Sequence, residues 1–177
     1  MPQRYSVLGN MKWLKMGTLL GAPLFAQALK VGDAVPSTLA AQDEKSQTIR
    51  FADLKGQWVV LYFYPHDDTP GCTSQAKEFS RLLDEFHKIG AQVYGLSTQG
   101  AESHKRFRQK YQLKVPLLTD KDGQVAKAFG VKVFAGMCSR DVVILSPEGK
   151  VALIRQGVSP ENSPSEILAW LKAQQGK

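Results

Sequence analysis

The feature that most constrains the fold is an unbroken run of β-branched and aromatic residues, Trp58 to Tyr64, which ends at Pro65. A continuous apolar run of this length, without polar alternation, is typical of a strand that is buried on both faces of a sheet. Proline cannot donate a hydrogen bond to a neighbouring strand, so we expect the strand to end there. The run therefore predicts a central strand with other elements packed over both faces of its sheet.

A short loop follows this strand and leads to Cys72, in the first turn of a predicted helix. Thr69 suits the N-cap of that helix, and Pro70 suits its first position. The free backbone N–H groups and the dipole of a helix N-terminus favour a thiolate over a thiol, and they also attract an anionic oxygen species. We therefore interpret Cys72 as a reactive cysteine.

Strands and helices alternate along the rest of the chain. Apolar residues recur at helical spacing from Ala76 to Ile89, and Gly90 closes that helix. We expect further helices over residues 102–111, 124–129 and 165–173, and further strands over residues 48–51, 91–97, 117–119, 141–145 and 151–155. This alternation, which ends in a hairpin, predicts an α/β fold in which helices flank a central mixed β-sheet.

The first 28 residues hold the three parts of a secretory signal peptide in the usual order. A positive stretch at residues 11–15 precedes an apolar run at 16–25, and Ala26-Gln27-Ala28 is a small-x-small cleavage pattern. The apolar run is shorter than the roughly 20 residues of a membrane span. We predict a start at Met11 and cleavage after Ala28, while an amphipathic or disordered N-terminal tail stays open as the alternative.

Cleavage would leave a mature domain of residues 29–177, the size of one ordinary domain. We expect it to be exported, to a bacterial periplasm or a thylakoid lumen. The whole chain carries a net charge of +7, and residues 1–28 hold three cations and no acidic residue, so the mature charge is about +4. The basic cluster at residues 105–110 is interpreted as a solvated helix face, so neither nucleic acid nor, after signal cleavage, a membrane is an expected partner.

The chain from about Val31 to the C-terminus resembles a peroxiredoxin of the bacterioferritin comigratory protein (PrxQ-type) branch. The resemblance rests on Leu61–Pro65 followed by Thr69–Thr73 and Gln75-Ala76, and its Pro-x-x-x-Thr-x-x-Cys core is a specific signal. It implies a thioredoxin-like fold and reduction of hydrogen peroxide or organic hydroperoxides, without metal, haem or flavin. It also implies a thiol reductant as partner, such as a thioredoxin-like protein, a glutaredoxin or a small thiol.

The resemblance implies a role for each matching residue. Cys72 would be the peroxidatic thiolate, the Thr69 hydroxyl would bond the thiolate and the peroxide, and Pro65 would shield the site from water. Arg140, which precedes the strand at 141–145, matches the active-site arginine, and a guanidinium keeps its charge while presenting several donors. The oxidised product would be a sulfenic acid, which a second thiol must clear.

The second thiol departs from the pattern of the branch. Many members place a resolving cysteine five residues after the peroxidatic one, where this chain has Lys77, and the predicted helix at 102–111 also holds no cysteine. Cys138 stands two residues before Arg140, and if this segment is extended, both side chains share a face and Cys138 lies near Cys72. A Cys72–Cys138 disulfide stays open, but we favour a one-cysteine cycle in a monomer or weak homodimer.

Two other functions fit the chain less well. A thiol–disulfide oxidoreductase usually needs Cys-x-x-Cys, but Cys72 is followed by Thr73-Ser74-Gln75. A non-catalytic thioredoxin-like binding domain would have no need for the whole set of site residues.

The histidines give no sign of a metal site. No second histidine lies at ligand spacing from His66-Asp67-Asp68, so this segment is interpreted as tuning the charge of the loop. His87 and His104 fall on predicted helices, and we expect both to face solvent.

Overall fold

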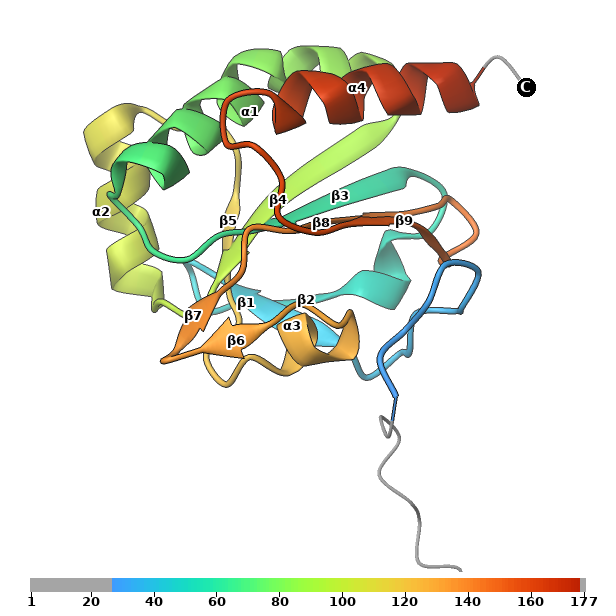
Figure 1. The fold of residues 1–177 in the computed structure, drawn as a ribbon, viewed down its shortest axis with the longest axis horizontal. Coiled ribbons are helices and arrows are strands. Elements are labelled where there is room, and N and C mark those ends of the chain that lie inside the picture. Colours follow the sequence, from blue (N-terminus) through green and yellow to red (C-terminus); the bar gives the residue numbers. More distant parts are fainter. Residues whose placement is uncertain (1–26, 176–177) are drawn as a thin grey trace, which may run out of the picture.

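A seven-stranded mixed sheet forms the centre of the molecule in the computed structural model, which describes residues 27–175 (Figure 1). The strand order is β2-β1-β5-β4-β3-β8-β9. Strands β3, β4 and β5 run parallel, and the outer strands pair antiparallel to their neighbours. The strands are β1 (Ala40–Asp43), β2 (Thr48–Arg50), β3 (Trp58–Phe63), β4 (Ala91–Ser97), β5 (Leu117–Thr119), β8 (Val142–Leu145) and β9 (Val151–Arg155). The predicted central mixed sheet is confirmed.

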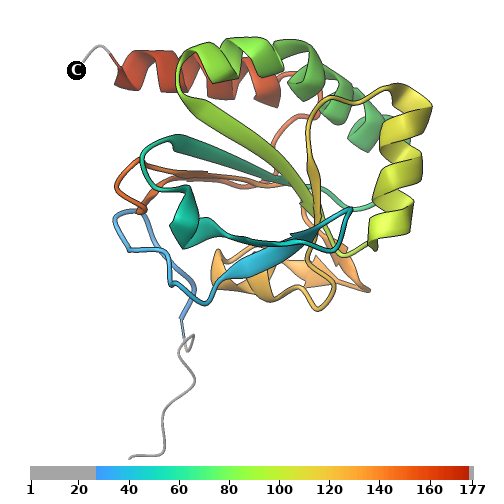
Figure 2. The same cartoon turned by 180° about the vertical axis from the view of Figure 1, so that it is seen from behind.

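Helices cover both faces of this sheet (Figures 1 and 2). One face packs against α1 (Pro70–Lys88), α2 (Ala101–Tyr111) and α4 (Ser163–Gln174). The other face packs against α3 (Gln124–Ala128) and the short 3₁₀ helix η1 (Phe51–Leu54). The hairpin of β6 (Val133–Phe134) and β7 (Met137–Cys138) forms a separate two-stranded sheet beside α3.

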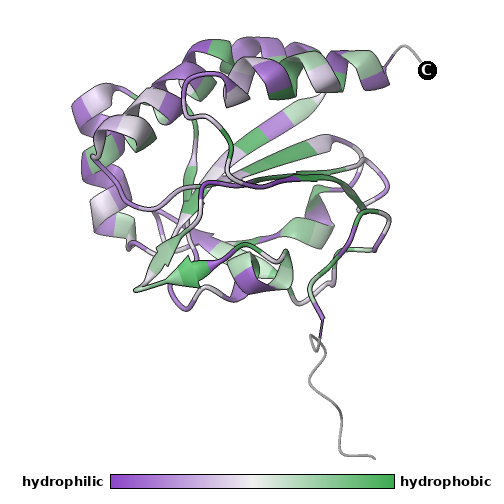
Figure 3. Cartoon of the chain, in the orientation of Figure 1, coloured by the Kyte–Doolittle hydropathy of each residue, from purple (hydrophilic) through white to green (hydrophobic). Residues whose placement is uncertain are grey.

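Strand β3 divides the interior into two hydrophobic cores. Val60 and Tyr62 point into the core under α1 and α4, while Val59, Leu61 and Phe63 point into the core over α3. Apolar colouring follows β3 and β8, whereas the helices alternate between polar and apolar along their length (Figure 3). The prediction of a strand buried on both faces is confirmed, and the strand ends one residue before Tyr64.

The sequence pattern missed three small elements. Strand β1 begins with Ala40-Ala41, residues of low strand propensity, and it forms because both β2 and β5 pair with it. The β6–β7 hairpin has only two residues in each strand, too few for a periodic pattern. Residues 51–54, expected in part as a turn, form η1. The predicted helices and strands otherwise lie within about two residues of the observed ones, the usual uncertainty of element ends.

Among residues 27–175, none of the helices has the combination of length and apolar character that a membrane span requires. The predicted start at Met11, together with the positive and apolar parts of the predicted signal peptide, lies outside the described residues.

Candidate active site

Cys72 is the third residue of α1 and is almost completely buried, at 2% exposure. Thr69 occupies the N-cap with an extended backbone (φ −98°, ψ 154°), and Pro70 is the first residue of the helix. The last residue of β3 and the first of α1 are separated by a short loop, so strand and helix together fix where the sulfur lies. The predicted position of Cys72 in the first helical turn is confirmed, and backbone N–H groups of such a turn lack intrahelical acceptors.

The side chain of Thr69 does not cap the helix. Its hydroxyl donates to the backbone carbonyl of His66 at 3.1 Å, within the same loop. Pro65 lies at the other end of this loop and, like Thr69, is half-buried. Both residues therefore lie in the loop that leads to Cys72, and the shape of that loop decides how closely they approach the sulfur.

Arg140, which lies 68 positions after Cys72 in the sequence, contacts the sulfur of that cysteine. Its Nη2 donates to the Cys72 sulfur at 3.4 Å, and its Nη1 donates to Oε1 of Gln75 at 2.9 Å. Gln75 is fully buried on α1, and its Nε2 donates to the hydroxyl of Ser163 at the start of α4, at 3.1 Å. The expected approach of Arg140 to the cysteine is thus found. Sequence reasoning used Gln75 only as part of the motif and missed that it holds the guanidinium.

Gly71 gives the guanidinium room to reach the sulfur. A Cβ atom at this position would lie 3.2 Å from Nη2 of Arg140, tighter than ordinary van der Waals contact. Any larger residue at position 71 would press on the group that donates to Cys72.

The loop before α1 is fixed by a buried cluster that the sequence did not reveal. Asp67 is 4% exposed, and its carboxylate accepts hydrogen bonds from the Tyr64 hydroxyl (2.6 Å), Ser103 Oγ (2.7 Å) and His104 Nδ1 (2.9 Å). Burial alone would raise the pKa of Asp67, but the hydrogen bonds from His104, Tyr64 and Ser103 together bring it below its ordinary value.

The expectation that His104 faces solvent is therefore wrong, because its side chain is fully buried. Its neighbours Lys105 and Arg106 are exposed, as the pattern of charges suggested. The imidazole is buried because it bonds Asp67. This partner lies 37 positions earlier in the chain, so the sequence of the helix alone could not reveal it. His87 is exposed as expected.

Cys138 does not lie beside Cys72. It is the last residue of β7 and packs into the core over α3, whereas Cys72 packs into the core under α1 and α4. The expectation of a shared face fails because the extended segment ends at Cys138, and Arg140 already lies in a bend that leads into β8. Both cysteines are free thiols in this structure.

The surroundings of Cys138 disfavour a thiolate. Burial, together with the negative charges of Asp120 and Asp141, raises the pKa of the Cys138 thiol to about 12. A thiol of this kind is a poor nucleophile near neutral pH, because the thiolate is the reactive form.

Three comparisons with known proteins agree with this arrangement. Residues 31–154 match the AhpC/TSA family. The chain belongs to this family. The chloroplastic peroxiredoxin Q of Sedum lineare is 37% identical over 153 residues, which cover 85% of this chain and 81% of the relative.

Two solved structures extend the match to three dimensions. A cysteine-to-serine mutant of PrxQ from Xylella fastidiosa aligns with a TM-score of 0.78 and 29% identity, over 84% of this chain and 99% of that chain. The bacterioferritin comigratory protein of Xanthomonas campestris, studied for alkyl peroxide reduction, aligns with a TM-score of 0.75 and 33% identity, over 82% and 97%. This AhpC/TSA family member therefore has the thioredoxin-like peroxiredoxin fold and is a thiol-dependent peroxidase.

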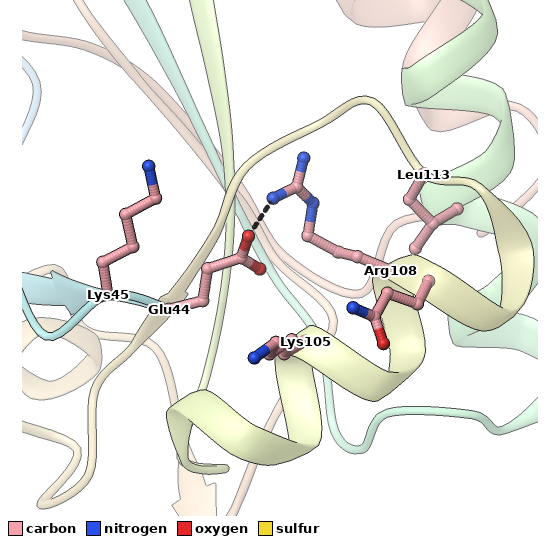
Figure 4. A pocket seen from close by; sticks show the side chains of 6 residues that line it. Glu44, Lys45, Lys105, Arg108 and Leu113 are labelled. Carbon is pink, nitrogen blue, oxygen red and sulfur yellow. Dashed lines mark hydrogen bonds and ion pairs between the residues drawn. The ribbon is translucent and has the colours of Figure 1, made fainter.

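A pocket of about 380 Å³ lies elsewhere on this family member, between α2 and the turn that joins β1 to β2 (Figure 4). Lys105 and Arg108 reach it from α2, and Arg108 forms an ion pair with Glu44 across it. None of the site residues predicted from the sequence lines this pocket. Within residues 27–175, no three His, Cys, Asp or Glu side chains come together as a metal site would require.

Proposed function

We propose that this thiol peroxidase reduces hydrogen peroxide and organic hydroperoxides at Cys72 in a one-cysteine cycle, as part of antioxidant defence. The observation that carries the proposal is the contact of Arg140 with the sulfur of Cys72, at the N-terminus of a long helix. A fixed cation and a set of backbone donors at one sulfur favour its thiolate, the nucleophile that the reaction needs. The alkyl peroxide reduction named for the Xanthomonas campestris relative supports the inclusion of organic hydroperoxides.

In the first step, the Cys72 thiolate attacks the distal oxygen of the peroxide, the one that carries only hydrogen. An S–O bond forms, the O–O bond breaks, and the departing oxygen takes a proton and leaves as water or an alcohol. Arg140 and the N–H groups of the first turn of α1 would stabilise the charge that develops on the oxygens. Thr69 would turn its hydroxyl from the His66 carbonyl toward sulfur and peroxide, and Pro65 would keep bulk water out.

In the second step, a thiol from outside attacks the sulfenic acid of Cys72, and water leaves as a mixed disulfide forms. A second external thiol then releases Cys72 as a thiol and carries the disulfide away. The position of Cys138 in the opposite core supports this cycle, because an internal disulfide would first require part of the fold to open. We include a monomer or weak homodimer in the proposal, which sedimentation analysis of the mature domain would test.

We also propose that the protein is exported after cleavage behind Ala28. Gln27 and Ala28 are exposed, while the backbone N–H of Leu29 donates to the carbonyl of Ala128 at 2.8 Å. Leu29 also packs against the core over α3, so the residue at which the mature chain would start is itself anchored to the folded domain. N-terminal sequencing of the protein from the periplasmic or lumenal fraction tests this, and a mature chain that begins at Met1 or Met11 would contradict it.

The decisive experiment treats the mature domain with one equivalent of hydrogen peroxide and follows intact mass and free thiols. A fast gain of one oxygen atom, with one thiol left, supports the one-cysteine cycle. A fast loss of both thiols without added oxygen would instead mean a Cys72–Cys138 disulfide. A reaction no faster than that of a free thiol would overturn the assignment of peroxidase activity to Cys72.

A further inference from the structure

The loop that carries Pro65 and Thr69 has no regular structure of its own. It occupies residues 64–69 between β3 and α1, and Asp68 within it adopts a positive φ of 59°. A loop without internal secondary structure keeps its shape only through contacts with the elements around it. The contacts that fix residues 65–69 therefore also fix where Pro65 and Thr69 stand relative to Cys72.

Asp67 is the buried charged residue of this loop, and its contacts reach α2 and the residues around it. Its carboxylate accepts from Ser103 Oγ and His104 Nδ1, both in the first turns of α2, and from the Tyr64 hydroxyl. Its backbone N–H donates to the side chain of Gln99, just before α2. A carboxylate at 4% exposure is costly to bury unless its oxygens stay bonded, so the loop cannot leave α2 without a large penalty.

Helix α2 is itself held in place, so it can act as a support. Phe107 is buried in the core under α1 and α4. On another side of the helix, Arg108 pairs with Glu44 from the β1–β2 turn, across the pocket in Figure 4. These two contacts fix the helix to the sheet and to its edge, and the positions of Ser103 and His104 follow from them.

We propose that His104, together with Ser103, is a positioning residue for the peroxide reaction: through Asp67 it fixes the loop that sets Pro65 and Thr69 around Cys72. Neither residue touches Cys72 in a hydrogen bond of the described structure, so both act through the loop. The inference rests on the proposed role of Cys72 as the peroxidatic cysteine. It adds His104, which stands 32 positions after Cys72 and on a different helix, to the residues that set the reaction rate.

The hydrogen bond from His104 Nδ1 separates this role from simple packing. The other ring nitrogen, Nε2, is buried without a hydrogen-bond partner among the described residues, so Nδ1 alone carries the polar contact. The amide of asparagine can place a donor near the position of Nδ1, whereas leucine fills similar space and donates nothing. The pair His104→Asn and His104→Leu therefore tests the hydrogen bond against the loss of the imidazole.

The experiment measures the second-order rate constant of Cys72 with hydrogen peroxide by stopped flow, for the mature domain and both variants. We expect His104→Leu to lower the rate constant about 10- to 100-fold, because small misplacements of a catalytic geometry have effects of this size. We expect His104→Asn to recover most of the wild-type rate constant. Thermal unfolding is recorded for both variants, because a purely structural role would lower both stabilities and leave the rate constant of the folded protein unchanged.

The exposed neighbour provides the control, since Lys105→Ala alters the same helix without touching Asp67. A wild-type rate constant in His104→Leu would overturn the inference, and so would an equal loss in the leucine and asparagine variants. If His104→Leu does not fold, Ser103→Ala and Ser103→Thr replace it, with a lower rate constant expected for alanine alone. A wild-type domain no faster than a free thiol would overturn the proposed function itself, whereas a fast wild type with unaltered variants overturns only this inference.

Discussion

Cys72 and Cys138 are equally buried, at 2% exposure each, yet a cation contacts one sulfur and carboxylates lie near the other. Arg140 donates to the sulfur of Cys72, which lies in the first turn of α1. Around Cys138, the nearby charges come from Asp120 and Asp141, and they raise its pKa together with burial. Burial and these negative charges disfavour the thiolate of Cys138, whereas the charged group that contacts the sulfur of Cys72 is positive.

The two sites also differ in the elements that build them. Cys72 lies where a strand passes through a short loop into a helix, an arrangement that leaves backbone donors free. Cys138 ends a short strand whose backbone is paired with Val133 of β6, and its side chain fills space in an apolar core. The comparison supports the proposal that Cys72 is the reactive thiol and Cys138 a packing residue, and four experiments test it.

The largest effect is expected from exchanging the two cysteines separately. Cys72→Ser should lower the reaction with hydrogen peroxide to the uncatalysed background, because the nucleophile is gone. Cys138→Ala should leave the rate constant within about twofold and cost about 1 kcal/mol of folding stability for the atoms removed from the core. Stopped-flow kinetics and denaturant titration measure both, and a strong loss of peroxide reactivity in Cys138→Ala would remove the distinction between the two thiols.

Arg140→Lys tests whether the two donor nitrogens of the guanidinium are needed at Cys72 and Gln75. Lysine keeps one positive charge but cannot hold Gln75 and the sulfur with two separate nitrogens, so we expect a fall in the rate constant of about 10- to 100-fold. Arg155→Lys is the matched control, because Arg155 is a partly exposed ion-pair partner of Glu166 at 3.7 Å and has no hydrogen bond to Cys72, Gln75 or Cys138 among the described residues. An Arg140→Lys rate constant equal to that of wild type would show that the reaction does not need two donor nitrogens at this position.

The pH dependence of alkylation tests the raised pKa of Cys138 in the folded Cys72→Ser variant. The thiol of Cys138 stays mostly neutral below about pH 12. Its reaction with iodoacetamide should therefore become about tenfold faster with each unit by which the pH is raised toward that value. At pH 8 it should be about a thousandfold slower than for an unfolded chain, whose thiol has its ordinary pKa. Mass spectrometry measures the labelling, and a plateau near pH 9 would contradict the raised pKa.

The smallest effect is expected from Asp141→Asn in the same background. Asparagine removes a negative charge near Cys138 but still offers an oxygen to the Gly157 N–H, which Asp141 now accepts at 2.9 Å. Burial, the larger cause of the raised pKa, remains, so labelling of Cys138 at a fixed pH should increase by less than about tenfold. Asp122→Asn, an exposed change, serves as control, and equal labelling in both variants would show that the charge of Asp141 has no part.

The part of the site within one short stretch was predictable from the sequence. Thr69, Pro70 and Cys72 are close along the chain, so the rules for helix starts place them without any distant contact. Arg140 was predicted from the resemblance alone, because no spacing rule can bring together residues that are 68 positions apart. The main strands of the sheet were predictable for a similar reason, because a run of apolar residues indicates a buried strand without reference to any distant contact.

The errors concern residues whose place depends on a distant partner. His104 stands among charged residues on α2, and only Asp67, from another loop, explains why its side chain is inside. A position of Cys138 beside Cys72 was left open on the condition that the chain is extended up to Arg140, but the strand ends at Cys138 after pairing with β6. The helix that carries His104 was predicted correctly and only its tertiary contact was missing, whereas the short hairpin that ends at Cys138 was itself missed.

In the proposed one-cysteine cycle, the seven-stranded sheet that separates the two cysteines leaves the oxidised Cys72 without an internal thiol to reduce it. In the proposed cycle, the lifetime of the sulfenic acid at Cys72 then depends on how much thiol the compartment supplies. Where that supply is low and peroxide persists, the same sulfur can be carried on to sulfinic acid, from which ordinary thiols do not recover it. In that cycle, the fraction of enzyme that keeps an active Cys72 would therefore depend on the concentration of reducing thiols in its compartment.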